Sequence, residues 1–157
     1  MSEDRVYLVR HAKAGSRSRW EGDDRLRPLS KPGERQARKL QRAFATIEVT
    51  HVSSSSYTRC VETVRPIAEE RGLQIEIDPS FVEGAATAEA LDVLRAVPPG
   101  TVICSHGDMI PAVVEYLAAD GLVIDGTTAW RKASTWILER RDGRFVRGRY
   151  VPPPEEG

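Results

Sequence analysis

The chain has 157 residues, a length typical of one domain with a single hydrophobic core. Hydrophobic residues make up 40% of it and charged residues 29%, a composition that excludes a mainly disordered chain. The 23 basic residues balance the 23 acidic ones, so the net charge favours neither a nucleic-acid partner nor a membrane surface. The longest apolar stretches are too short to span a bilayer, and the first residues form no apolar signal segment, so we expect a cytoplasmic protein.

The contents of cysteine and histidine argue against a metal site. Cys60 and Cys104 form no Cys-x-x-Cys pair, so we expect neither a disulfide framework nor a thiolate site. Cys104 lies in an apolar run, where it would be a small buried side chain, and a reactive thiol at Cys60 is not favoured. The three histidines lack an accompanying carboxylate cluster, and the sequence therefore predicts no metal and no cofactor.

The first predicted strand ends in two polar residues. Residues 6–9 form a short apolar run, typical of a strand that is buried on both faces in a parallel sheet. Arg10 and His11 follow directly, at the carboxyl end of the strand, where open α/β sheets bind ligands. Taken alone, this pair is more simply a solvated arginine and a histidine that bonds a carbonyl group. Residues 12–29 then form a long loop, of a length typical of functional or disordered segments.

Helices and strands alternate after this loop. A helix is predicted to begin near Ser30 and Pro32, since proline favours the first turn. Residues 49–53 form the second predicted strand, and the serines after it are expected to cap a helix. That helix contains Pro66, which should kink it or delay its start. Residues 73–77 alternate in polarity and are expected to form a strand near the sheet edge.

The second half of the chain continues the alternation. Thr87 is predicted to cap a helix, and residues 101–104 form another apolar strand that leads to His106. Asp108 is expected to cap the following helix rather than to act in catalysis. An Asp-Gly pair at residues 142–143, between two strand-like segments, predicts a hairpin.

The predicted fold is a three-layer α/β/α arrangement. The alternation of strands and helices indicates a mainly parallel sheet with helices on both faces, closed by an antiparallel C-terminal edge hairpin. We expect a single domain over residues 1–157. Residues 152–157 would be a frayed tail, because their prolines cannot join a β-ladder.

Polar residues from three strand ends are expected to meet at one edge of this sheet. Arg10 and His11 follow the first strand, Ser55 and Arg59 the second, and His106 a later one. Arginine binds phosphate oxygens with two parallel hydrogen bonds. A neutral imidazole can attack phosphorus, and a second imidazole can stabilise the charge that spreads over the oxygens. The combination indicates a pocket for a tetrahedral phosphoryl group.

These motifs resemble the histidine phosphatase superfamily, whose hallmark is Arg-His-Gly near the N-terminus. Here the hallmark is Arg10-His11-Ala12, and alanine in the third place resembles the small SixA-type phosphohistidine phosphatases. Further matches are Ser54-Ser55 leading to Arg59, and Ser105-His106-Gly107. The chain also resembles the phosphatase-like domain that is fused to MutT-type Nudix hydrolases in actinobacteria. This resemblance lies in residues 11–17, 23–24, 27–29 and 132–136.

The resemblance implies a phosphoglycerate mutase-like fold and a role for each matching residue. His11 would be the nucleophile, with Arg10, Arg59 and His106 as phosphate ligands and His106 also acting in catalysis. Glu83 occupies about the place of the general acid of larger members, although a solvated loop carboxylate is an equally simple reading. Ser55 would contact the phosphate, although helix capping explains it equally well.

The implied activity is that of a metal-independent phosphatase with a phosphohistidine intermediate. Its substrate would be a protein phosphohistidine, or alternatively a nucleotide or another small-molecule phosphate. Val82–Ala96 leaves little room for the long insertion that covers the site of the related mutases. An alternative of another class is a non-catalytic module that binds a phosphorylated ligand.

Overall fold

The computed structural model describes residues 4–154, which form one seven-stranded sheet with four helices and two short 3-10 turns. The strands are β1 (Arg5–Arg10), β2 (His51–Ser54), β3 (Ile75–Ile77), β4 (Thr101–Ser105), β5 (Val123–Asp125), β6 (Thr135–Arg141) and β7 (Arg144–Val151). The helices are α1 (Lys31–Ala43), α2 (Thr58–Glu70), α3 (Thr87–Ala96) and α4 (Met109–Ala119), and the 3-10 turns are η1 (Asp24–Leu26) and η2 (Pro79–Phe81).

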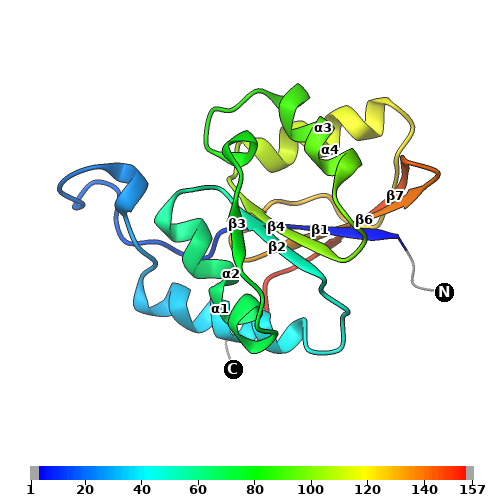
Figure 1. Ribbon diagram of the computed structural model, residues 1–157. Helices are drawn as coiled ribbons and strands as arrows, with labels where there is room; N and C mark the ends of the chain where they lie inside the picture. Colours follow the sequence, from blue (N-terminus) through cyan, green and yellow to red (C-terminus); the bar gives the residue numbers. More distant parts are fainter. Residues whose placement is uncertain (1–3, 155–157) are drawn as a thin grey trace.

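The sheet has the order β3-β2-β4-β1-β6-β7-β5. Strands β1 to β4 run parallel to one another, whereas β6 pairs antiparallel with both β1 and β7. Helices α1 and α2 cover one face and α3 and α4 the other, which confirms the predicted three layers (Figure 1). The C-terminal hairpin is also confirmed, but its predicted place at the edge is wrong. Strand β5, which the sequence analysis did not predict, pairs with β7 and forms the edge.

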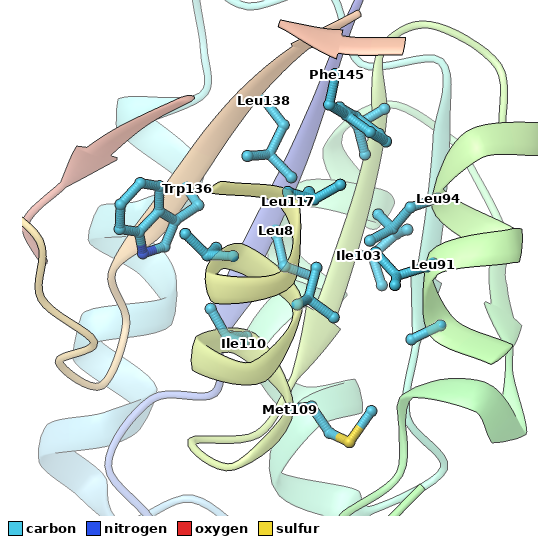
Figure 2. Packing of buried hydrophobic residues seen from close by; sticks show 14 of the residues in the cluster. Leu8, Leu91, Leu94, Ile103, Met109, Ile110, Leu117, Trp136, Leu138 and Phe145 are labelled. Carbon is cyan, nitrogen blue, oxygen red and sulfur yellow. The ribbon is translucent and has the colours of Figure 1, made fainter. Parts of the chain in front are cut away.

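Strand β1 lies at the centre of the sheet, and its side chains are buried on both faces. Leu8 belongs to the cluster beneath α3 and α4, together with Ile103 and Trp136 (Figure 2). Tyr7 and Val9 point to the other face and pack in a second cluster beneath α1 and α2. This burial on both faces explains the continuous apolar run of β1, as predicted.

Of the first three helices, α1 begins as the sequence predicts, whereas α2 and α3 do not. Ser30 caps α1, as predicted, because its hydroxyl accepts a hydrogen bond from the Gly33 N–H at 3.1 Å. The predicted serine cap of α2 is wrong: Tyr57 holds the N-cap position, and the Ser55 hydroxyl lies 2.8 Å from the His106 ring. Pro66 lies well inside α2, which already starts at Thr58.

The predicted cap at Thr87 is likewise wrong. Thr87 is the first residue of α3, and Ala86 precedes it as the N-cap. Alanine has no side-chain acceptor, so the sequence signal pointed to the nearest hydroxyl, one residue too late.

Residues 12–29 form a segment that projects from the body of the molecule (Figure 1, blue). It contains η1 and is closed at its base by an antiparallel bridge between Ala14 and Leu29. At the other end of the chain, β7 stops at Val151 and Pro152, Pro153 and Pro154 continue outside any strand. The rest of the predicted tail, residues 155–157, lies outside the described residues. Within residues 4–154, none of the helices combines the length and the apolar character that crossing a bilayer requires.

Candidate active site

A cavity of about 540 Å³ opens at the carboxyl ends of β1 and β4. Four of the six predicted site residues line it, namely Arg10, His11, Glu83 and His106. The other two, Arg59 and Ser55, are buried, with exposed fractions of 1% and 0%. Strands β1 and β4 pair in parallel with Arg10 opposite Ser105, so the residues that follow the two strands lie close together. His11 and His106 therefore follow neighbouring strands, with their ring centroids 5.5 Å apart.

His11 is held as a neutral imidazole. Burial, together with the charges of His106, Arg59 and Arg10, lowers its pKa to about 3. Its Nδ1 lies 2.8 Å from the carbonyl oxygen of Ala12. A carbonyl only accepts, so Nδ1 carries the proton, and Nε2 of the neutral ring keeps a free lone pair.

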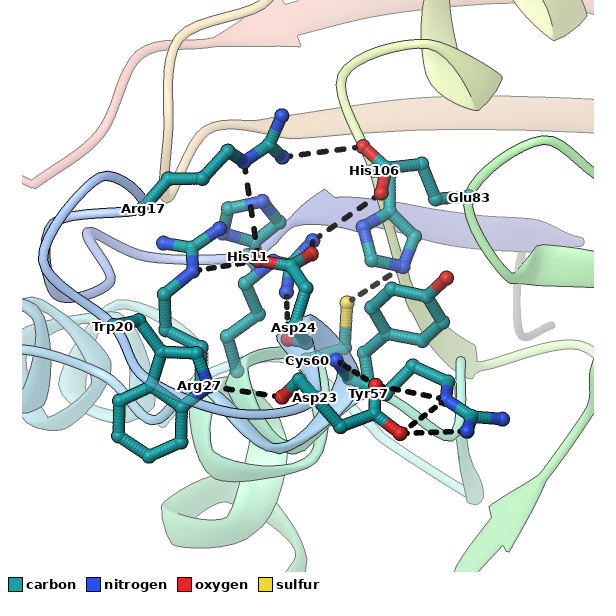
Figure 3. A network of polar contacts seen from close by, with 12 residues as sticks. His11, Arg17, Trp20, Asp23, Asp24, Arg27, Tyr57, Cys60, Glu83 and His106 are labelled. Carbon is teal, nitrogen blue, oxygen red and sulfur yellow. Dashed lines mark hydrogen bonds and ion pairs between the residues drawn. The ribbon is translucent and has the colours of Figure 1, made fainter.

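His106 is held by contacts from the start of α2. Its Nε2 lies 2.8 Å from the Ser55 hydroxyl. The same nitrogen lies 3.5 Å from Sγ of Cys60, and the Tyr57 ring packs edge-on against the imidazole (Figure 3). Three side chains from one short stretch of sequence therefore fix the orientation of this imidazole. The Ser55 hydroxyl therefore contacts the His106 ring and does not occupy the N-cap position of α2.

The backbone around Arg10 is held by residues far away in the sequence. The Ala133 N–H donates to the carbonyl oxygens of Arg10 and His11 at 3.1 and 3.2 Å, and the Arg10 N–H donates to Ser134. Ala133 takes a φ of 64°, a left-handed conformation that is uncommon for alanine. Nη1 of Arg10 donates to the Trp130 carbonyl at 2.6 Å.

Gly107 lies against the other side of the Arg10 guanidinium. A Cβ atom at this position would come within 2.7 Å of Cζ and Nη2 of Arg10. The glycine therefore lets the guanidinium pack directly on the backbone that follows β4. This close approach explains why the Ser-His-Gly motif ends in glycine.

Arg59 is engaged by the projecting segment. Its Nη1 donates to the Asp24 carbonyl at 3.0 Å, while its Nη2 lies 3.3 Å from the Asp24 carboxylate. The hydrogen bond from Arg27, with the charges of Arg59, Arg27 and Arg17, lowers the pKa of Asp24. An ionised carboxylate thus sits against the arginine that the sequence marks as a phosphate ligand.

Glu83 and Asp108 both act as hydrogen-bond acceptors. The two Glu83 oxygens lie 3.4 Å from Arg17 and 3.5 Å from Arg59, so the carboxyl group faces two cations (Figure 3). Asp108 occupies the N-cap position of α4, but its carboxylate accepts from the Gly84 N–H at 2.8 Å. The expected capping bond from Asp108 is therefore wrong, because the turn after Glu83 uses this acceptor.

Unsatisfied polar atoms gather at the same place. Within residues 4–154, four buried side-chain nitrogen or oxygen atoms lack a hydrogen-bond partner, and three of them are Nε of Arg10, Nε of Arg59 and Nδ1 of His106. Native proteins leave few such atoms, so their concentration in one place marks a functional site. No group of three or more potential metal ligands occurs in this described part of the chain.

Sequence reasoning missed two contributors to the site. Asp24 carried a signal, since it is part of the Asp23-Asp24 pair in a long polar loop, but its contact with Arg59 depends on how that loop folds back. The Trp130 carbonyl carried none, because a main-chain acceptor leaves no trace in the residue type.

The sequence matches a known protein family and is similar to individual proteins. The model of the histidine phosphatase superfamily (branch 1) matches residues 6–88, more than half of the chain. An 8-oxo-(d)GTP phosphatase of Mycolicibacterium smegmatis is 37% identical over 157 aligned positions, covering 96% of this chain and 49% of that protein. The chain thus spans about half the length of this curated relative.

Solved structures share the fold at low sequence identity. The protein histidine phosphatase SixA, in a complex with tungstate, superposes with a TM-score of 0.75 at 18% identity, over 96% of this chain and 97% of that one. A mycobacterial glucosyl-3-phosphoglycerate phosphatase in complex with VO3 gives a TM-score of 0.71 at 17% identity, over 97% and 100% of the two chains. At these identities the likeness shows the fold.

Proposed function

The chain belongs to the histidine phosphatase superfamily, and we propose that it is a phosphatase whose nucleophile is His11. Nε2 of His11 attacks the phosphorus atom and forms an N–P bond. The bond from phosphorus to the leaving group breaks, and the leaving group departs with the electron pair. Water then attacks the phosphohistidine, so that inorganic phosphate is released and the neutral imidazole is restored.

The observation that carries this proposal is the neutral His11, with Nε2 free, among cationic and donor groups. A nucleophile must keep its lone pair, and the lowered pKa of His11 leaves the ring unprotonated at neutral pH. Arg10, Arg59 and His106 supply buried nitrogen atoms without partners beside it. These groups would bind the phosphoryl oxygens and stabilise their charge in the transition state. No step of this scheme calls for a metal ion.

The first candidate substrate is a protein phosphohistidine. The fold is shared with SixA, and the cavity opens at the molecular surface, where a protein side chain could enter. The leaving imidazole also depends less on a general acid than an alcohol does, which suits a site whose candidate acid, Glu83, is engaged by two arginines.

A second candidate is a nucleotide phosphate. The observation that favours it is the 37% identity to an 8-oxo-(d)GTP phosphatase along almost the whole of this chain. The cations around the cavity, considered below, also suit a substrate with more than one negative group.

The test is hydrolysis of p-nitrophenyl phosphate in the presence of EDTA by the wild type, His11→Ala and His51→Ala. His51 is a matched control, because this exposed histidine lies at the start of β2 and contacts Thr50. We expect the wild type and His51→Ala to turn over at the same rate and His11→Ala to lose at least about a thousandfold, as for the removal of a nucleophile.

Equal rates for the wild type and His11→Ala would exclude His11 as the nucleophile. Loss of wild-type activity in EDTA would contradict the metal-free scheme. An inert wild type that still binds inorganic phosphate would support the non-catalytic binding module instead.

A further inference from the structure

We propose that Lys13 and Lys132 form a second anion subsite beside His11, which selects substrates whose leaving group is itself a phosphate. The inference rests on the proposed function and names its substrate class: nucleoside di- and triphosphates or inorganic pyrophosphate, hydrolysed at the terminal phosphate.

The cavity holds more cations than one phosphoryl group requires. Five basic residues line it, against the two carboxylates of Glu83 and Asp108; the five are Arg10, Lys13, Arg17, Arg27 and Lys132. Arg17 and Arg27 are paired with carboxylates, mainly that of Asp24. In the described part of the chain, the ammonium groups of Lys13 and Lys132 have no hydrogen-bond or ion-pair partner. These two charges are available to a ligand.

Lys132 lies in an unfavourable electrostatic environment. Partial burial, together with the positive charges of Arg10, Arg27, Lys13 and Arg17, lowers its pKa. Cations gathered without an opposing charge repel one another, and a bound anion removes that repulsion. The cluster therefore favours a ligand with a higher negative charge than a monoester carries.

The main chain holds both lysines beside the nucleophile. Lys13 is two residues from His11, and its carbonyl accepts from both the N–H and the hydroxyl of Ser30 at 3.0 Å. Its N–H donates to Gln36 at 3.0 Å. Lys132 precedes Ala133, whose N–H bonds the His11 carbonyl. Anchored backbones lower the cost of ordering these side chains around a ligand.

The chemistry of the leaving group also favours a substrate from which a phosphate departs. Attack of Nε2 of His11 on the terminal phosphorus breaks its bond to the bridging oxygen, which departs with the electron pair as part of a phosphate. A phosphate leaves as a stable anion without a proton from a general acid, in agreement with Glu83 facing Arg17 and Arg59. The lysines would neutralise the charge that develops on this departing group.

The experiment compares ADP with AMP, which differ by one phosphate, together with pyrophosphate and p-nitrophenyl phosphate, all in EDTA. The proteins are the wild type, Lys13→Met, Lys132→Met, the double variant and Lys31→Met. Lys31 is a matched control, since it is an exposed lysine in the first turn of α1 and lies outside the cavity. Methionine keeps the length of the side chain and removes its charge.

We expect the wild type to prefer ADP over AMP in kcat/KM, and each cavity variant to lower the ratio of the two values about tenfold, as for the loss of one charged hydrogen bond. Lys31→Met should keep the wild-type ratio. Equal kcat/KM for ADP and AMP in the wild type, or an unchanged ratio in the double variant, would overturn the subsite.

Calorimetry separates this inference from the proposed function. Pyrophosphate and phosphate are titrated into His11→Ala and into His11→Ala combined with both lysine substitutions. Tighter binding of pyrophosphate that disappears with the lysines supports the subsite even if p-nitrophenyl phosphate is not hydrolysed. Equal affinities for the two anions would refute it, even in an active phosphatase.

Discussion

The Asp24 carboxylate lies 3.3 Å from Nη2 of Arg59, and the Asp24 carbonyl accepts a hydrogen bond from Nη1 of the same guanidinium at 3.0 Å. Two groups of one residue thus engage the arginine that would bind the phosphoryl group. The carbonyl orients the guanidinium, whereas the carboxylate competes with a phosphate for its charge. The projecting segment at residues 12–29 thereby contributes directly to the site.

Asp24→Asn should therefore tighten the binding of phosphate. Asparagine keeps the carbonyl contact and the side-chain size but removes the competing charge, which at a partly exposed pair is worth about 1 kcal/mol, or roughly fivefold in affinity. The measurement is the inhibition constant of inorganic phosphate in p-nitrophenyl phosphate hydrolysis. Asp23→Asn is the control, since Asp23 pairs with Arg25 at the surface. Weaker binding in Asp24→Asn would mean that the carboxylate helps to orient Arg59.

The lowered pKa of His11 makes the stability of the protein depend on pH. The folded-state value is about 3, against 6.5 for an unperturbed histidine, so the unfolded chain binds more protons between these two values. The free energy of unfolding therefore rises with pH in this window. The stability that the neutral His11 contributes is lost progressively as the pH falls from 6.5 towards 3. On acidification from pH 6.5 to pH 4.5, the protonation of His11 alone should lower the free energy of unfolding by about 2–3 kcal/mol.

Urea unfolding at both pH values, followed by tryptophan fluorescence, tests this dependence on wild type and His11→Asn. The variant lacks the titrating group, so its stability should decrease less over the same interval. Parallel losses in the two proteins would show that His11 is not held neutral by the fold.

Gly107→Ala should impair catalysis without unfolding the protein. The added methyl group would lie 2.7 Å from the Arg10 guanidinium, which must shift away from the place where we propose that it binds the phosphoryl group. We expect kcat/KM for p-nitrophenyl phosphate to fall by roughly 10- to 100-fold, as for a misplaced catalytic contact. An unchanged circular dichroism spectrum would establish that the fold is retained. Wild-type activity would mean that Arg10 tolerates displacement.

Gly33→Ala should reduce stability. A Cβ atom at Gly33 would lie 1.8 Å from the Lys13 carbonyl oxygen, so helix α1 or the start of the projecting segment must move. We expect a loss of about 1–3 kcal/mol or more in the free energy of unfolding, as for overpacking of a rigid contact. Lys31→Ala, at an exposed position two residues earlier, should change it by less than about 0.5 kcal/mol. Equal stabilities of the two variants in thermal unfolding would contradict the close approach.

The layers and most of the site could be predicted from the sequence. The continuous apolar runs of β1 and β4 reflect burial on both faces, and the polar residues directly after them had to share one edge of a parallel sheet. Arg10, His11 and His106 follow from that logic, and the family motifs add Arg59 and Ser55.

Other features depend on tertiary contacts that leave little local signal. Strand β5 has three residues, and the exposed Val123 is half of its apolar content, so it exists because β7 offers a pairing edge. The predicted capping bond from Asp108 failed for a related reason. A polar side chain near a helix start has several possible partners. The Asp108 carboxylate accepts a hydrogen bond from the nearby Gly84 N–H and none from the first turn of α4.

The backbone bonds around His11 also set the order in which a functional molecule can form. Its N–H pairs with Ser105, and the carbonyls of Arg10 and His11 are bound by Ala133, so partners more than ninety residues downstream complete the geometry of the pair. During synthesis, the N-terminal strand leaves the ribosome long before these partners exist. The proposed nucleophile is therefore made before the residues that fix its backbone, and its geometry is complete only after they have been made. A chain that stops short of residue 133 retains every side chain of the predicted catalytic group but lacks the clamp that aligns it.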